Sequence, residues 1–146
     1  MSRKLPLKYQ KQPSVIINRT AFKDTRLVYV ARANRKLRYK LARSRIVYIG
    51  TTRVGANRIA VSAAKKGEEL LSNYGVKHLE FNIVVCGRLQ GVETWRKLER
   101  ALIIRFRELY SDPPKANKTG EKMRWKDERQ YFSLSRLDKI IAELSK

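Results

Sequence analysis

The segment Arg45-Ile46-Val47-Tyr48-Ile49-Gly50-Thr51-Thr52 has the composition of a β-strand that ends in a turn. β-branched and aromatic residues favour the extended conformation, and Gly and Thr follow where the strand should end. A second segment of the same kind, Leu27-Val28-Tyr29-Val30-Ala31, lies upstream, and Leu79 to Cys86 has the pattern of a third strand. A single tyrosine in such a strand usually fills the core. Two tyrosines in two such strands make a functional role worth testing.

Three other segments have the apolar spacing of helices. Glu93 to Tyr110 carries apolar residues at steps of three and four and is the strongest helix candidate. A helix is also expected from about Ala56 to a stop at Tyr74-Gly75. Ser135 and Asp138 predict the capped start of a third, amphipathic helix near the end of the chain.

The 146 residues carry 34 Lys and Arg against 13 Asp and Glu, a formal net charge of +21. Since 42% of the residues are hydrophobic, the composition indicates a folded basic protein and excludes a disordered polycation. Such a charge implies a polyanionic partner, because neutralised phosphates release condensed counterions. A non-catalytic ribosomal or chromatin protein would have the same composition, so charge alone does not indicate catalysis.

The chain has one cysteine, Cys86, so an internal disulfide is excluded. We interpret Cys86 as a small buried strand residue in a reducing compartment. No segment resembles a signal peptide or a membrane-spanning helix, so we expect no membrane association and a cytoplasmic location. One Cys and one His cannot form a Cys/His zinc site, so any metal must be held by oxygen ligands.

Between Leu27 and Gly120 the sequence resembles the GIY-YIG nuclease family. That family has two strand tyrosines, an arginine, a glutamate and an asparagine in this order, and Tyr29, Tyr48, Arg58, Glu99 and Asn117 match them. The second motif is present as Tyr-Ile-Gly, whereas the first is Leu-Val-Tyr and lacks the leading glycine. The resemblance implies an α+β fold with a small three-stranded antiparallel sheet flanked by helices.

The resemblance also implies an activity, the metal-dependent hydrolysis of phosphodiester bonds in double-stranded DNA. Glu99 would hold one Mg²⁺ or Mn²⁺, and Arg58 would neutralise a non-bridging phosphate oxygen. Tyr29, and less certainly Tyr48, would orient or deprotonate the attacking water, which requires nearby cations to lower a phenol pKa from about 10. Asn117 would position the backbone or a metal-bound water. Without the resemblance, Glu99 would be read as a salt bridge at the rim of its helix.

This reading divides the chain into a basic arm at 1–26, a nuclease core at 27–120 and a C-terminal extension at 121–146. The core contains a basic insertion at 32–45, for which we expect a long hairpin turning near Asn34-Arg35, although a helical turn also fits. We expect this insertion to lie beside the site with no acid nearby. The residues expected to bind DNA are Arg32, Arg35, Lys36, Arg38, Lys40, Arg43, Arg45 and Arg53.

Two functions remain open at this stage. One is the endonuclease, with a restriction, phage, homing or repair role. The other is a non-catalytic basic protein that binds nucleic acid. Sequence specificity would have to come from the arm, the insertion, the C-terminal helix or a homodimer.

Overall fold

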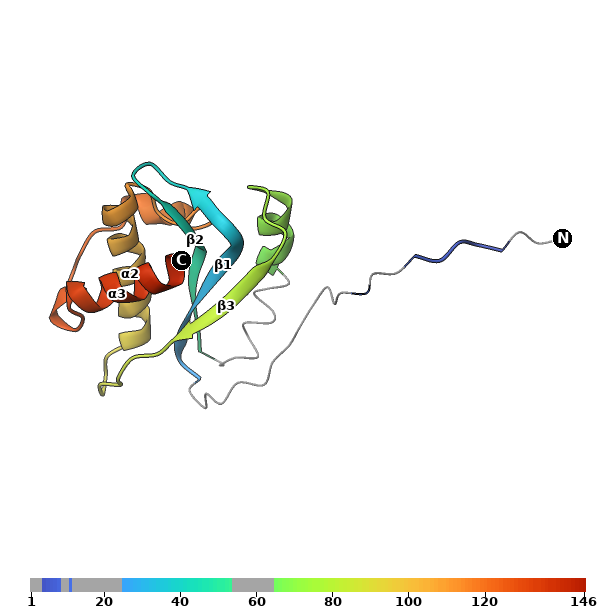
Figure 1. Cartoon of the computed structure of the whole chain (residues 1–146). Coiled ribbons are helices and arrows are strands. Elements are labelled where there is room, and N and C mark those ends of the chain that lie inside the picture. Colours follow the sequence, from blue (N-terminus) through green and yellow to red (C-terminus); the bar gives the residue numbers. More distant parts are fainter. Residues whose placement is uncertain (1–3, 9–10, 12–24, 54–64) are drawn as a thin grey trace.

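The computed structural model describes residues 4–8, 11, 25–53 and 65–146. Its centre is a three-stranded antiparallel sheet of β1 (Leu27–Arg38), β2 (Arg43–Thr52) and β3 (Leu79–Val84), in the order β2-β1-β3 (Figure 1). The middle strand pairs with both neighbours, so that Tyr29 lies opposite Gly50 on one side and Ile83 on the other. The α+β class with a three-stranded antiparallel sheet is therefore confirmed.

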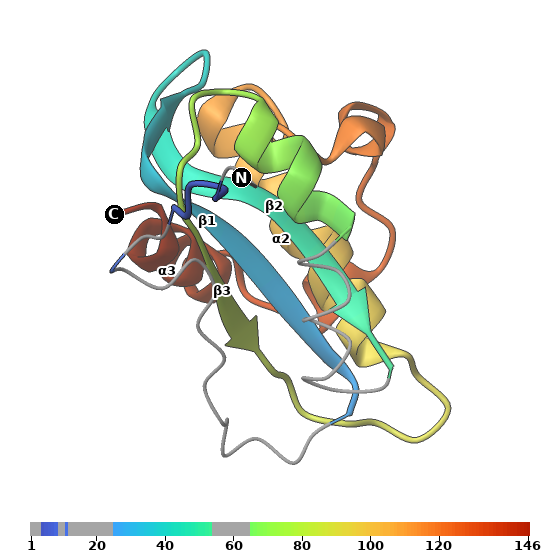
Figure 2. The same cartoon turned by 90° about the vertical axis from the view of Figure 1, so that its right-hand side faces the viewer.

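Helices cover both faces of the sheet. α2 (Thr94–Tyr110) and α3 (Leu134–Ser145) pack on one face, and a helix at 65–72 lies over the opposite face (Figures 1 and 2). Two short 3-10 helices, η1 (Lys118–Lys122) and η2 (Glu128–Gln130), connect α2 to α3. No helix within the described residues combines the length and the apolar character needed to cross a membrane.

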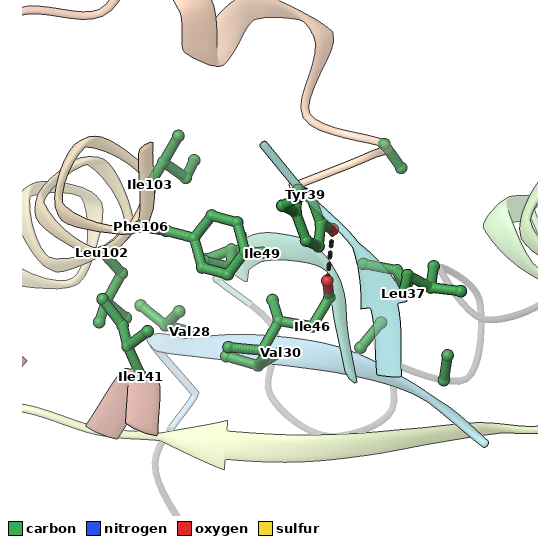
Figure 3. Packing of buried hydrophobic residues seen from close by; sticks show 14 of the residues in the cluster. Val28, Val30, Leu37, Tyr39, Ile46, Ile49, Leu102, Ile103, Phe106 and Ile141 are labelled. Carbon is green, nitrogen blue, oxygen red and sulfur yellow. Dashed lines mark hydrogen bonds between the residues drawn. The ribbon is translucent and has the colours of Figure 1, made fainter. Parts of the chain in front are cut away.

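The main core lies between the sheet and the helix pair α2 and α3. Alternate strand residues point to this face, and apolar side chains of both helices meet them (Figure 3). The side chains at its centre are Val28, Val30, Ile49, Leu102, Phe106 and Ile141. The intervening strand positions point to the other face, where Tyr29 packs with Tyr48, Phe81 and Ile83. The two tyrosines therefore share the face opposite α2.

The basic insertion is a hairpin, as expected, but its turn lies later in the chain than Asn34-Arg35. The turn is closed by the Tyr39 amide, which donates to the Ala42 carbonyl oxygen at 2.9 Å. The Tyr39 ring is buried at 5.0 Å from the Phe106 ring, and its hydroxyl donates to the Ile46 carbonyl oxygen at 2.6 Å (Figure 3). Because Leu37 and Tyr39 are both buried, β1 continues through the expected turn, and the helical alternative is wrong.

Two further details differ from the sequence expectations. The N-cap of α3 is Ser133, whose hydroxyl oxygen accepts from the Arg136 amide, because Asp138 instead pairs with Arg105 at 2.6 Å. Cys86 follows the end of β3 and is only partly buried, so it is not a buried strand residue.

Candidate active site

The two tyrosines meet above Gly50. Tyr29 and Gly50 are cross-strand partners, and the Tyr29 and Tyr48 ring centroids are 6.0 Å apart. A Cβ atom on Gly50 would lie 2.6 Å from the Tyr29 Cζ and hydroxyl oxygen and 2.9 Å from the Tyr48 ring. Gly50 is therefore required by packing, because only a residue without a side chain lets both rings close over β2.

Tyr48 is a poor candidate for the general base. Burial raises the pKa of its phenol, and the hydrogen bond with Tyr29 and the charges of Glu99 and Glu69 raise it further. The Lys66 ammonium lies 5.1 Å from the Tyr48 ring centroid, yet it does not reverse this balance. The expectation that surrounding cations lower the pKa is thus wrong for Tyr48, which remains a protonated hydrogen-bond donor at neutral pH.

Glu99 approaches the same strand from α2. Burial raises the pKa of its half-buried carboxyl group, while a hydrogen bond with Thr51 and the charges of Arg96 and Arg100 partly oppose this shift. Thr51 directly follows Gly50, so Glu99 contacts β2 one residue from the glycine over which the tyrosines close. The negative charge of Glu99 is close enough to the Tyr48 hydroxyl to raise the pKa of its phenol. Tyr29, Tyr48 and Glu99 therefore converge on the last residues of β2.

The carboxylate of Glu99 is not part of a salt bridge with its arginine neighbours. Arg96 pairs with Glu93 at 3.2 Å, and Arg100 pairs with the buried Glu128 at 2.8 Å. Glu99 forms no ion pair within the described part of the chain. Neither Arg96 nor Arg100 therefore forms the rim salt bridge that was considered from the sequence.

Asn117 holds the free edge of β2. Its amide oxygen accepts from the Ile49 N–H at 2.9 Å, and its amide nitrogen donates to the Ile49 carbonyl oxygen at 2.9 Å. The Ala116 amide also donates to the Val47 carbonyl oxygen at 2.9 Å. The Asn117 side chain thus pairs with the Ile49 backbone as a residue of a neighbouring strand would. It satisfies backbone groups at an edge of the sheet that would otherwise be unpaired. Asn117 positions the site through the backbone of β2, and its amide points at the strand.

Two further arginines were predicted from the sequence to act at the site. Arg58 is outside the described residues. Arg53 follows the end of β2 and is largely exposed, and its guanidinium lies 3.6 Å from Glu93. The structure therefore places Arg53 beside the N-terminal end of α2, the helix that carries Glu99.

The predicted DNA-binding cations of the hairpin fall into three groups, according to the partners that their side chains have. Arg32 and Arg45 are partly buried: both contact Glu80, at 3.3 and 3.1 Å, and both donate to the Lys146 carbonyl oxygen. Lys40 pairs with Asp112 at 3.5 Å, and Arg35 donates to the Tyr74 carbonyl oxygen at 2.8 Å. Lys36, Arg38 and Arg43 are exposed, with no side-chain partner among the described residues. The expectation that no acid lies near the insertion was wrong, because Glu80 and Asp112 come from distant segments.

The oxygen ligands at Glu99 suit a hard divalent cation. A carboxylate beside the Thr51 hydroxyl is the donor chemistry that Mg²⁺ prefers, with the remaining positions left to water and substrate. The described residues contain no group of three or more His, Cys, Asp and Glu that could enclose a metal. A bound ion would therefore depend on one protein carboxylate and on the phosphate itself.

Trp95 lies one helical turn before Glu99 on the same side of α2. Its ring is stacked under the Arg26 guanidinium at 4.9 Å, and its buried indole N–H has no hydrogen-bond acceptor among the described residues. The Thr51 hydroxyl was missed because nothing in the sequence shows that α2 crosses the end of β2.

No protein-family model, no curated protein and no solved structure matches this chain.

Proposed function

We propose that this protein is a metal-dependent endonuclease that hydrolyses phosphodiester bonds of double-stranded DNA. The observation that carries the proposal is the convergence of Tyr29, Tyr48 and Glu99 on the end of β2. The net charge of +21 supports a polyanionic substrate. The single partly buried cysteine agrees with a reducing, cytoplasmic location.

Each residue has a distinct part in the proposed chemistry. Glu99 and Thr51 would hold one Mg²⁺ or Mn²⁺, which when bound supplies positive charge to the scissile phosphate. Tyr29 and Tyr48 would orient the attacking water with their hydroxyls, and Tyr48 acts as a donor because its phenol stays protonated. Arg58 would neutralise a phosphate oxygen, and Asn117 keeps the end of β2 in place.

The decisive test is nicking of supercoiled plasmid by the purified protein with Mg²⁺ and with EDTA. The Glu99→Gln variant keeps the size of the side chain and removes the charge, so we expect cleavage to fall by about 10³ or more, roughly 4 kcal/mol of barrier. Glu108→Gln is the matched control, since Glu108 lies on the same helix, and the polar partners of its carboxylate among the described residues are Trp125 and Arg105. Equal cleavage by both variants would remove Glu99 from the site.

A non-catalytic nucleic-acid-binding protein is the second candidate. It is favoured by the finding that Asn117 and Gly50 have sufficient structural reasons for their identity in β2. This candidate predicts tight DNA binding with no metal-dependent nicking, so the same plasmid assay distinguishes the two. Gel filtration with and without DNA tests whether a homodimer contributes to either function.

A further inference from the structure

The tip of the β1 and β2 hairpin, residues 38–43, is a surface that the catalytic chemistry does not use. It lies at the end of the two strands remote from Gly50, and the loop projects beyond the sheet (Figures 1 and 2). Leu41 and Tyr48 are separated by seven residues of chain, which at about 3.3 Å per residue places them roughly 20 Å apart. The hairpin tip is therefore not beside the site, contrary to the sequence expectation.

Two like charges face each other at this tip. Arg38 and Arg43 are direct cross-strand partners, both are exposed, and neither has an acidic partner among the described residues. Like charges directly opposite in an antiparallel pair destabilise the sheet. The repulsion between the two guanidinium groups is relieved when an anion lies between or across them. The arrangement therefore suits a partner that carries phosphates.

An apolar side chain lies between these cations. Leu41 is 68% exposed and lies in the turn between Lys40 and Ala42. The turn is rigidly held, because the Leu41 amide donates to the Tyr110 carbonyl oxygen at 3.1 Å and the Lys40 amide donates to Asp112 at 3.0 Å. The fold therefore fixes Leu41 in an exposed position instead of letting it collapse onto the core.

We propose that the hairpin tip is a second DNA contact, in which Arg38 and Arg43 bind backbone phosphates and Leu41 packs against bases within a groove. Apolar side chains carried between basic residues are used in this way to contact and unstack base steps. At about 3.4 Å per base pair, the tip would meet the duplex about six base pairs from the reacting phosphate. The inference rests on the proposed function only for its choice of double-stranded DNA as ligand.

The test uses binding to a 24-base-pair duplex in EDTA, so that cleavage does not enter. The double variant Arg38→Gln, Arg43→Gln should lower the slope of log affinity against log salt by about 1.8. The control Arg136→Gln, Lys139→Gln removes the same charge from the exposed face of α3 and should leave the slope nearly unchanged. Leu41→Ser should weaken binding about tenfold without changing the slope, because it removes an apolar contact and no charge.

The outcomes separate this proposal from its alternatives. Thermal unfolding of the double variant should occur at an equal or higher temperature than in the parent, since a repulsive pair is lost, so weaker binding cannot be attributed to misfolding. An unchanged salt slope, or equal losses in the α3 control, would overturn the proposal. Equal Leu41 dependence on single-stranded DNA or on duplex RNA would also overturn it, because a B-form groove would not be required. A protein that shows the predicted binding but never nicks plasmid would refute the endonuclease and leave the hairpin contact standing.

Discussion

At the scale of single residues, the candidate site contains one residue that the packing requires, Gly50, and one whose burial lowers the stability of the folded state, Glu99. Gly50 is needed because the Tyr29 ring occupies the space of its Cβ. Glu99 is the opposite case, because its carboxylate is half-buried and has no salt bridge within the described residues. A group that is unfavourable for stability and lies beside two tyrosines is a functional candidate on physical grounds.

The cost of Glu99 predicts a pH-dependent effect on stability. Because burial raises the folded-state pKa of Glu99, the protonated form is favoured on folding, and its stabilising contribution is lost as pH rises through that pKa. Glu99→Gln should therefore be at least as stable as the parent at pH 7. The advantage should shrink as pH falls towards the ordinary glutamate pKa near 4.5. Urea unfolding between pH 4 and 8 measures this, and a variant less stable at every pH would contradict it.

The two tyrosine hydroxyls should differ in their contribution to cleavage. Tyr29→Phe and Tyr48→Phe keep both rings packed over Gly50, so both variants should fold with thermal midpoints close to the parent. If the hydroxyls orient the water, single-turnover cleavage should fall by about 10² or more, the range of general acid–base and orienting groups, with Tyr29→Phe the more affected. Parental rates in both variants would show that the tyrosines serve only the core.

At the scale of elements, β2 is the strand on which the site depends, and its free edge is held by the connection after α2. Asn117 forms both of its hydrogen bonds with Ile49, and Ala116 bonds to Val47. The far end of β2 is fixed by the turn at Tyr39 and by α2. The strand that delivers Tyr48 is thus fixed along its whole length before any ligand binds.

Replacing Asn117 should therefore affect stability before it affects chemistry. Asn117→Ala removes two buried hydrogen bonds and leaves the Ile49 N–H and carbonyl at an open edge, which should cost about 2–4 kcal/mol. Asn34→Ala is a suitable control, because Asn34 accepts one exposed hydrogen bond from the Lys77 amide and should cost less than about 1 kcal/mol. Equal free energies of unfolding for the two variants would show that the edge contact contributes little.

At the scale of the whole molecule, ion pairs from α2 hold the C-terminal region in place. Lys97 bonds to Asp127 at 2.7 Å, Arg100 to Glu128 at 2.8 Å, and Arg105 to Asp138 at 2.6 Å. All three cations lie on the same helix that carries Glu99. The C-terminal region is therefore joined to the sheet and α2 by charge as well as by the buried side chains of Leu137 and Ile141.

These ion pairs predict that the protein loses stability in acid. Burial alone would raise the pKa of Glu128, but its hydrogen bonds with Arg100 and the Lys126 amide outweigh burial and hold the pKa below its usual range. The hydrogen bond from Arg105 likewise holds the pKa of Asp138 low. Because the folded-state values are lowered, this stability is present above the ordinary values near 4.5 and 3.8 and is lost as pH falls through the lowered ones.

Urea unfolding from pH 7 to pH 3 tests this prediction. Glu128→Gln should cost about 1–3 kcal/mol at pH 7 and should lose less further stability in acid than the parent. Asp138→Asn should show the same flattening with a smaller cost at pH 7, because its carboxylate is partly exposed. Parallel pH profiles for parent and variants would contradict the assignment.

The sequence by itself determined the three strands, the strongest helix and the position of Glu99 at the border of its apolar face. These features follow from the spacing of apolar residues along the chain, which can be read from the sequence. Only the tertiary structure shows which basic side chains of the hairpin pair with an acidic residue. Glu80 is 48 residues from Arg32 and 35 from Arg45, so no local pattern could show that these arginines are partly buried. It also decided the place of the hairpin turn, because only packing against Phe106 makes Tyr39 a core residue. The raised pKa of Tyr48 has the same origin, since it comes from burial and from Tyr29, Glu99 and Glu69, which are brought to Tyr48 only in the folded chain.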